Sequence, residues 1–235
     1  MIEYLKKCLS ELNIEISDYQ LNQFQIFYDL LIEKNKVMNL TAITEEKEVV
    51  LKHFVDSVLL LKYIEIDHSS IIDVGTGAGF PGIPLAIMCP DSEFMLLDAL
   101  NKRINFLKEV VENCKLENVN LIHARAEELG HDKMFREKYD FCISRAVSNL
   151  SALLEYSSPF VKKKGKVITY KSEKIQEELD ESSNAQKILS CKLDDVISFK
   201  LPDGNTGRSF LIFEKEELTP VKYPRNAAKM KKKSL

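Results

Sequence analysis

The strongest constraint on the fold is the alternation of short apolar runs with helical segments that begins at Ile71. The runs are 71–75, 93–98, 119–122, 139–144, 165–171 and 209–215, and helical patterns such as Lys102–Cys114 and Asn149–Phe160 lie between them. Strands that alternate with helices indicate a parallel sheet covered by helices on both faces. The turn-prone segment 202–205 separates 194–200 from the last run, which predicts an antiparallel hairpin at one edge.

Residues 1–66 have a different pattern and predict a helical extension in front of the sheet. Glycine and proline are absent from the sequence before residue 75, which favours continuous helices. Leu21, Phe24, Tyr28 and Leu31 recur at helical spacing, and Ser17 is a suitable N-cap. A second helix is expected over 45–63. We therefore expect a helical extension over 1–66, an α/β domain over 67–219 and a tail over 220–235.

The chain is acidic overall, whereas its tail is basic. The formal net charge is -3, which argues against a protein that binds polyanions over its whole surface. After Pro220, the segment 221–235 contains six lysines or arginines and no acid. Such a tail is either a solvated, disordered end or an arm that contacts phosphates.

Cysteine usage and hydropathy exclude several classes of protein. The five cysteines are scattered and form no CxxC pair, so we expect reduced thiols and no metal site. No apolar run reaches the roughly 18 residues that a membrane helix needs. The N-terminus mixes acids with lysines and does not resemble a signal peptide. We expect a cytoplasmic protein that acts as a monomer and contacts no membrane.

The most informative stretch of the sequence is the glycine loop, residues 73–82, in which an apolar run leads through Asp73-Val74 into glycines and then into a helix. Glycine permits a positive φ and lets a ligand approach the backbone closely. Pro81 suits the first turn of the following helix. The pattern predicts a ligand outside the carboxyl end of the first strand, against Gly75, Gly77 and Gly79.

A glycine loop alone does not identify its ligand, because nicotinamide, flavin and methyl-donor sites all use one. Gly77, Gly79 and Gly82 even satisfy the literal dinucleotide pattern. Asp73, however, suits a cationic amino group such as that of a methionine moiety and would be unhelpful beside a pyrophosphate. Asp98 ends the run 93–98 at the distance expected of an acid that binds ribose hydroxyls. S-adenosylmethionine is therefore the favoured cofactor, with a nicotinamide cofactor as the alternative.

Two later strand ends also reach the predicted crevice. After the run 119–122, Ala126 or Glu127 could contact an adenine amino group, although a solvated helix N-terminus explains the acids nearly as well. After the run 139–144 comes Arg145, followed by Ala146-Val147. This arginine could bind a phosphate, the O6 and N7 edge of guanine or the carboxylate of the ligand, or form only a surface salt bridge.

The sequence around the site favours an acceptor that needs no general base. The Asn/Asp-Pro-Pro-aromatic pattern of amine methylation and the Pro-Cys pattern of attack at cytosine are absent. Cys142 lies inside an apolar run and is expected to be a buried core thiol. Guanine N7 carries a lone pair and no proton, so positioning can supply much of the catalysis. For this reason we name no catalytic base.

Taken together, the motifs resemble those of one family, glucose-inhibited division protein B, a ribosomal RNA small subunit methyltransferase family. The resemblance covers nearly the whole chain. The segments that carry it are Asn39-Leu40-Thr41, 53–57, 73–84, 97–103, 123–127, 144–147 and Tyr223-Pro224-Arg225. This combination is far more specific than the glycine loop alone.

The resemblance implies a class I S-adenosylmethionine-dependent methyltransferase, with a Rossmann-like, mostly parallel seven-stranded sheet and an antiparallel edge. It implies N7 methylation of one guanosine in the decoding region of the 16S rRNA, with this rRNA or the small ribosomal subunit as partner. It implies donor contacts at Gly75, Phe80, Asp98, Ala99, Leu100, Ala126, Glu127 and Arg145. His53, Lys171 and Arg225 are the residues expected to face the RNA or the site.

The sequence departs from the family pattern in two places. Ser172 follows Lys171 where a glycine is usual, and the tail after Arg225 lacks the further prolines and glycine of relatives. The resemblance nevertheless favours the tail as a phosphate-contacting arm, whose removal should leave donor binding intact. The alternatives are a methyltransferase for a small molecule or a protein, a nicotinamide-dependent oxidoreductase, and a non-catalytic RNA-binding module.

Overall fold

In the computed structural model, which describes residues 1–145 and 148–235, seven strands form one sheet in the order β3-β2-β1-β4-β5-β7-β6. The strands are β1 (Ser70–Val74), β2 (Glu93–Asp98), β3 (Val119–His123), β4 (Tyr139–Arg145), β5 (Val161–Ser172), β6 (Cys191–Lys200) and β7 (Gly207–Lys215). The first five are parallel, and β7 is antiparallel to both β5 and β6. The expected fold class is confirmed, including the hairpin at the edge.

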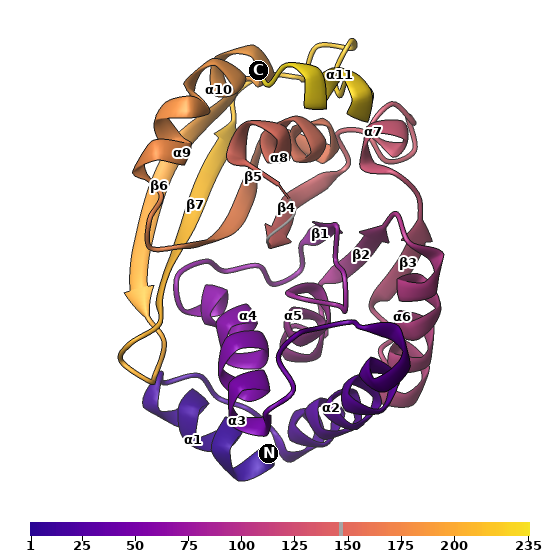
Figure 1. The fold of residues 1–235 in the computed structure, drawn as a ribbon, viewed down its shortest axis with the longest axis vertical. Coiled ribbons are helices and arrows are strands. Elements are labelled where there is room, and N and C mark those ends of the chain that lie inside the picture. Colours follow the sequence, from indigo (N-terminus) through magenta and orange to yellow (C-terminus); the bar gives the residue numbers. More distant parts are fainter. Residues whose placement is uncertain (146–147) are drawn as a thin grey trace.

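Helices cover both faces of the sheet (Figure 1). One face carries α1 (Ile2–Glu11), α2 (Asp18–Met38), α5 (Gly82–Met88) and α6 (Asn101–Cys114), and the other carries α8 (Leu150–Ser157) and α10 (Ser183–Leu189). Side chains alternate between the two faces along β1, because successive residues of a strand point to opposite sides. Ile71 therefore packs in the core under α2 and α5, whereas Ile72 and Val74 pack in the core under α8.

The N-terminal extension shares one hydrophobic core with the sheet. Ser17 and Gln20 form a capping box at the start of α2, as the sequence predicts for Ser17. The helix expected over 45–63 is present as four consecutive segments, α3 (Glu46–Val49), the π-helical turn η1 (Val50–Val55), α4 (Asp56–Val58) and η2 (Leu59–Lys62). Buried Phe27 of α2 lies 5.2 Å from the ring of Phe80 in the glycine loop. This packing holds the extension against the loop.

The C-terminal segment returns across the domain after β7 and ends in α11 (Ala227–Lys232), close to α7 (Ala126–Leu129) and α8 in Figure 1. Arg136 fixes its path by donating to the carbonyl oxygens of Thr219 at 2.6 Å and Tyr223 at 2.9 Å. Tyr223 is buried. The tail is therefore docked on the domain, which disfavours the alternative of a disordered, solvated end.

Within the described residues, no helix combines the length and apolarity needed to cross a bilayer.

Candidate active site

The glycine loop lies where the order of the strands reverses, between β1 and β4. In an open parallel sheet this switch point creates a crevice outside the carboxyl ends of the strands. Gly75, Gly77 and Gly79 have φ values of 75°, 63° and 95°, in the left-handed region that glycine adopts without strain. The N–H groups of Gly75 and Thr76 donate to the carbonyl oxygen of Leu97 at 2.9 and 3.0 Å, which ties the loop to the end of β2.

Glycine is required at different positions of the loop for two different structural reasons. A Cβ atom at Gly79 would lie 2.7 Å from Ile83, and one at Gly82 would overlap Leu96 and approach the Asp73 carboxylate to 2.8 Å. These two positions allow α5 to pack closely on the sheet. A Cβ at Gly77 would meet only the Gly75 carbonyl, at 3.9 Å, so this part of the loop is open to a ligand. The helix α5 begins at Gly82. Pro81, which the sequence places in the first turn of this helix, is its N-cap.

Asp73, at the end of β1, is fully buried beneath the loop. Its Oδ2 accepts the Gly82 N–H at 2.9 Å, while Oδ1 has no hydrogen-bond partner among the described residues. Burial raises the pKa of Asp73 to about 7, although the Thr76 side chain and the Gly82 hydrogen bond act in the opposite direction. Asp73 thus anchors α5 to β1. The contact of Asp73 with an amino group of a ligand remains a prediction. Its oxygen without a partner could accept a hydrogen bond from such a group.

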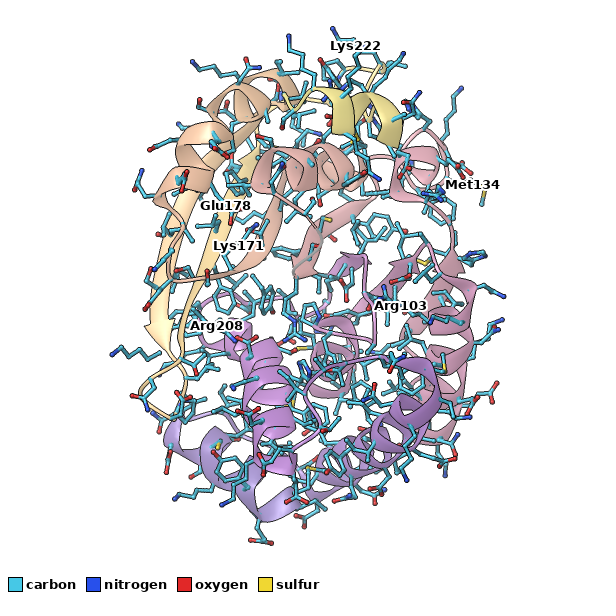
Figure 2. The ribbon with its side chains drawn as sticks, viewed as in Figure 1. Arg103, Met134, Lys171, Glu178, Arg208 and Lys222 are labelled. Carbon is cyan, nitrogen blue, oxygen red and sulfur yellow. The ribbon has the colours of Figure 1, made fainter. Side chains whose placement is uncertain are left out.

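Asp98, at the end of β2, holds the other side of the loop. Its carboxylate accepts the Gly77 N–H at 2.9 Å, the Leu100 N–H at 2.8 Å and the Arg103 guanidinium at 3.1 Å. Leu100 itself is exposed. Arg103, which Figure 2 shows at the end of α6 nearest the loop, adds a cation to this carboxylate. The expected ribose-binding acid is therefore preorganised at the crevice.

A cavity of about 490 Å³, the α11 cavity, opens on one side of the loop. Its floor comes from the ends of β1, β2 and β3 and includes Gly75, Asp98, Ala99, Ala126 and Glu127. Five of the predicted cofactor residues, from three strand ends, thus meet in one space. The remaining wall comes from α8 and from α11.

A second cavity of about 440 Å³, the basic pocket, opens on the other side of the loop. It shares Gly75 with the α11 cavity and adds Gly77 and Phe80 of the loop. Its other lining includes the imidazole of His53 and five cationic side chains, Lys52, Arg103, Arg145, Lys171 and Arg208. The pocket is thus suited to an anionic or guanine-like group.

Asp56 organises the cations of the basic pocket. It is buried in α4, and its two oxygens accept Arg145 Nη1 at 3.0 Å and Arg208 Nε at 3.1 Å. Arg145 also lies over the ring of Phe80, 5.0 Å from its centroid. Arginines held by a buried carboxylate lose little further freedom when they bind a ligand.

His53 is a neutral part of the same arrangement. Its ring stacks on Phe80 at 4.5 Å, its Nδ1 lies 3.1 Å from Arg145 Nη2, and its Nε2 lies 2.8 Å from the Thr41 hydroxyl. Burial, together with the charge of Arg145, lowers the pKa of His53 to about 3. An arginine can only donate, so Nδ1 accepts and the ring proton resides on Nε2. His53 therefore orients Arg145.

Comparison with known protein families identifies the family to which the chain belongs. A model of the GidB family, described as rRNA small subunit methyltransferase G, matches residues 20–206. The chain belongs to the GidB family. This membership confirms the resemblance inferred from the sequence.

Individual relatives match the GidB chain over nearly its whole length. The ribosomal RNA small subunit methyltransferase G of Lachnoclostridium phytofermentans is 48% identical over 222 residues, 94% of this chain and 92% of that protein. The protein of the same name from Alkaliphilus oremlandii is 47% identical over 235 residues, 99% of this chain and 98% of that protein. The crystal structure of M. jannaschii TYW2 in complex with AdoMet has a TM-score of 0.54 at 20% identity, over 69% of this chain and 76% of that one, and shows a shared fold.

The remaining residues that the GidB resemblance singles out have partners within the protein. Lys171 of β5 lies in the basic pocket and pairs with Glu178 of α9 (Gln176–Glu181) at 2.6 Å, and the two side chains point toward each other in Figure 2. Arg225 lies on the α8 side and pairs with Glu155. A contact of either residue with RNA remains a prediction. Ala146-Val147, expected at the acceptor side, lie outside the described residues.

Three contributors to the GidB site are missing from the sequence prediction. The sequence indicates only that Asp56 shares a helical face with His53, because its burial between two arginines is a tertiary property. Arg208 stands at the start of an apolar run, where nothing distinguishes it from a surface residue. Met230 of α11 lies in a tail expected to leave the donor site untouched, yet it lines the α11 cavity. Only the His53–Asp56 spacing carries a usable signal.

Proposed function

We propose that this chain transfers the methyl group of S-adenosylmethionine to N7 of one guanosine in the 16S rRNA. The observation that carries the proposal is the pair of cavities that meet at Gly75. One contains the carboxylate of Asp98, and the other contains basic side chains held around Asp56. Membership of a family named for methylation of small-subunit rRNA supports the same acceptor.

The residues of the α11 cavity fit the adenosyl part of the donor. Asp98 is an acid suited to the ribose hydroxyls, while Ala126 and Glu127 begin α7, just after β3, where an adenine amino group would need an acceptor. The open face of Gly77 suits the linker toward methionine. Asp73 is fully buried and lines neither cavity, so its expected contact with the ammonium group stays a prediction that rests on its unpartnered oxygen. The donor, when bound, supplies a methyl group on a sulfonium sulfur.

The basic pocket fits the acceptor and the anionic end of the donor. Arg145 lies over the Phe80 ring and lines the same pocket as Gly75, so its guanidinium suits the methionine carboxylate, which is one of the partners that the sequence leaves open for it. Lys52, Lys171 and Arg208 line the same pocket from other elements and suit phosphates of the RNA. Because guanine N7 has a free lone pair, the residues need only position the base and exclude water.

The proposal includes the setting of the reaction. We infer that the chain acts as a monomer in the cytoplasm, on rRNA within the small subunit or on the free molecule.

The test is methyl transfer from radiolabelled S-adenosylmethionine to three acceptors: unmodified small ribosomal subunits, free 16S rRNA and a protein extract. Labelled RNA is digested to nucleosides and analysed by mass spectrometry. We expect 7-methylguanosine at one position of the 16S rRNA and no label in protein. Label in protein or in another nucleoside would contradict the acceptor.

Calorimetry tests the donor separately. We expect S-adenosylmethionine and S-adenosylhomocysteine to bind and NADH not to bind. NADH binding in the absence of S-adenosylmethionine binding would support the oxidoreductase alternative instead.

A further inference from the structure

The α11 cavity is closed on one side by the C-terminal helix. Met230 and Ala227 of α11 line it opposite the strand ends, together with Tyr156 of α8. Met230 is only 6% exposed although the neighbouring residues of its segment are basic and mostly exposed. We propose that α11 is a wall of the donor site and that Met230 is a positioning residue that packs against the adenine ring. This inference rests on the proposed function.

The chemistry of the cavity fits a flat aromatic base under Met230. Val74, Leu97 and Ala126 contribute apolar surface, whereas Asp98 and Glu127 place carboxylates at its polar positions. Ligand pockets of this kind combine an apolar lining with a few polar groups that fix orientation. A methionine thioether is polarizable and makes favourable contacts with aromatic rings. A purine with one exocyclic amine matches both properties.

A built anchor holds α11 over this cavity. Buried Glu155 of α8 accepts the Arg225 side chain at Nε and Nη2, at 2.8 and 2.6 Å, and the Arg225 backbone N–H at 2.8 Å. His131 contacts the carbonyl oxygen of Pro224 at 2.8 Å. The Asn226 side chain then caps α11 by accepting the Lys229 N–H at 2.9 Å. A bidentate pair on a buried carboxylate is a strong, directional contact.

The same short helix carries the basic residues of the tail. Lys229, Lys231 and Lys232 lie on α11, and Lys231 lines the α11 cavity. If the donor stabilises α11, it also stabilises the position of these cations, and RNA bound to them increases donor affinity by the same factor. The wall thus couples the binding of the two substrates. It also reverses the sequence expectation that removal of the tail leaves donor binding intact.

The decisive experiment compares Met230→Ala with Met134→Ala by calorimetry with S-adenosylhomocysteine. Met134 is 77% exposed and lies at the edge of the molecule, so it is a matched control (Figure 2). We expect Met230→Ala to weaken binding about tenfold, which equals roughly 1.4 kcal/mol. Met134→Ala should leave binding unchanged, and Met230→Leu should retain most of the affinity. Circular dichroism melting confirms that each variant is folded.

Hydrogen exchange of the wild-type protein provides a second readout. Amides of 226–235 should exchange more slowly when S-adenosylhomocysteine is present. Equal affinities of wild type and Met230→Ala, with no change in exchange, would overturn the inference while leaving the proposed function intact. Absence of any binding by the wild type would instead overturn the proposed function.

Discussion

The buried acids of this protein differ in how their charge is compensated. Asp56 faces two arginines, and Glu155 faces Arg225 in a three-bond contact. Asp73 has instead one backbone donor and an oxygen without a partner among the described residues. Native proteins rarely bury such a group without a reason. Asp73, the buried acid without a compensating cation in the described part of the chain, therefore lies beneath the loop that is expected to receive a cationic ligand.

The titration of Asp73 predicts a pH dependence of stability. Burial raises its pKa from 3.8 to about 7, so the folded protein holds a proton that the unfolded chain releases between those values. The stabilisation is therefore complete below about pH 4 and is lost as the pH rises through 7. Between pH 4 and pH 7, the unfolding free energy of the wild type should therefore fall by a few kcal/mol relative to that of Asp73→Asn. Each unit of difference between the folded and unfolded pKa corresponds to about 1.4 kcal/mol.

Urea unfolding of both proteins at several pH values measures this difference. The asparagine variant keeps an acceptor for the Gly82 N–H and lacks the titrating group. Parallel stability curves for the two proteins would contradict a raised pKa at Asp73.

A second prediction at this scale concerns Asp98, whose carboxylate accepts two backbone N–H groups and Arg103. Asp98→Asn removes the charge while keeping the size of the side chain. Donor affinity should fall by about 1.5–3 kcal/mol, the range for a hydrogen bond to a charged group. Calorimetry with S-adenosylhomocysteine measures the change. Exposed Asp91 provides the control Asp91→Asn, and equal losses in both variants would remove Asp98 from the donor site.

At the scale of elements, close packing of α5 on the sheet positions the glycine loop. A Cβ atom at Gly82 would overlap Leu96 and approach Asp73, whereas one at Gly204 would meet no atom within 4 Å. Gly82→Ala should therefore destabilise the protein by about 1–3 kcal/mol, the usual cost of overpacking. Gly204→Ala is the control and should cost about 1 kcal/mol, because its φ of 69° is the remaining difficulty. Chemical unfolding would detect the larger loss at Gly82, and the reverse order would show that α5 can shift freely.

The sequence predicts those elements whose signals are local. The apolar runs, the hairpin after the turn at 202–205 and the Ser17 cap each depend on neighbouring residues, and the structure contains all of them. The fold class follows from their alternation. The strand-end residues Asp98, Ala126 and Glu127 also meet as expected, because parallel strands end at one edge.

Contacts between distant elements could not be predicted in the same way. Arg145 and His53 are 92 positions apart, and their contact depends on how the extension packs against Phe80. The docking of α11 depends on Glu155, a residue that resembles any other acid on a helix in the sequence. The composition therefore shows that the tail is basic, but it does not predict where the tail packs on the domain.

At the scale of the whole molecule, a net charge of -3 coexists with a basic tail, in which residues 221–235 contain six lysines or arginines and no acid. The tail lies at the top of the view in Figure 1 and α1 at the bottom, whereas the basic pocket lies between them, because α1 packs against η1, which supplies Lys52 and His53. Such a local cluster of cations can attract RNA to the tail although the chain as a whole is acidic. The orientation of the RNA is then selected before any base is contacted.

The basic tail predicts a local salt dependence of RNA binding. Replacing Lys232 and Lys233, both exposed in the tail, with glutamine should lower affinity for a 16S rRNA fragment. Removing one lysine–phosphate interaction should reduce the slope of log affinity against log salt by about 0.7–0.9, so the pair should reduce it by roughly one to two. The matched control replaces Lys6 and Lys7, exposed on α1 at the other end, and should leave the slope unchanged. Filter binding over a range of potassium chloride concentrations measures both slopes. Equal slopes in the two double variants would mean that RNA approaches the protein from elsewhere, because long-range attraction between charged surfaces decays over about 10 Å at moderate salt.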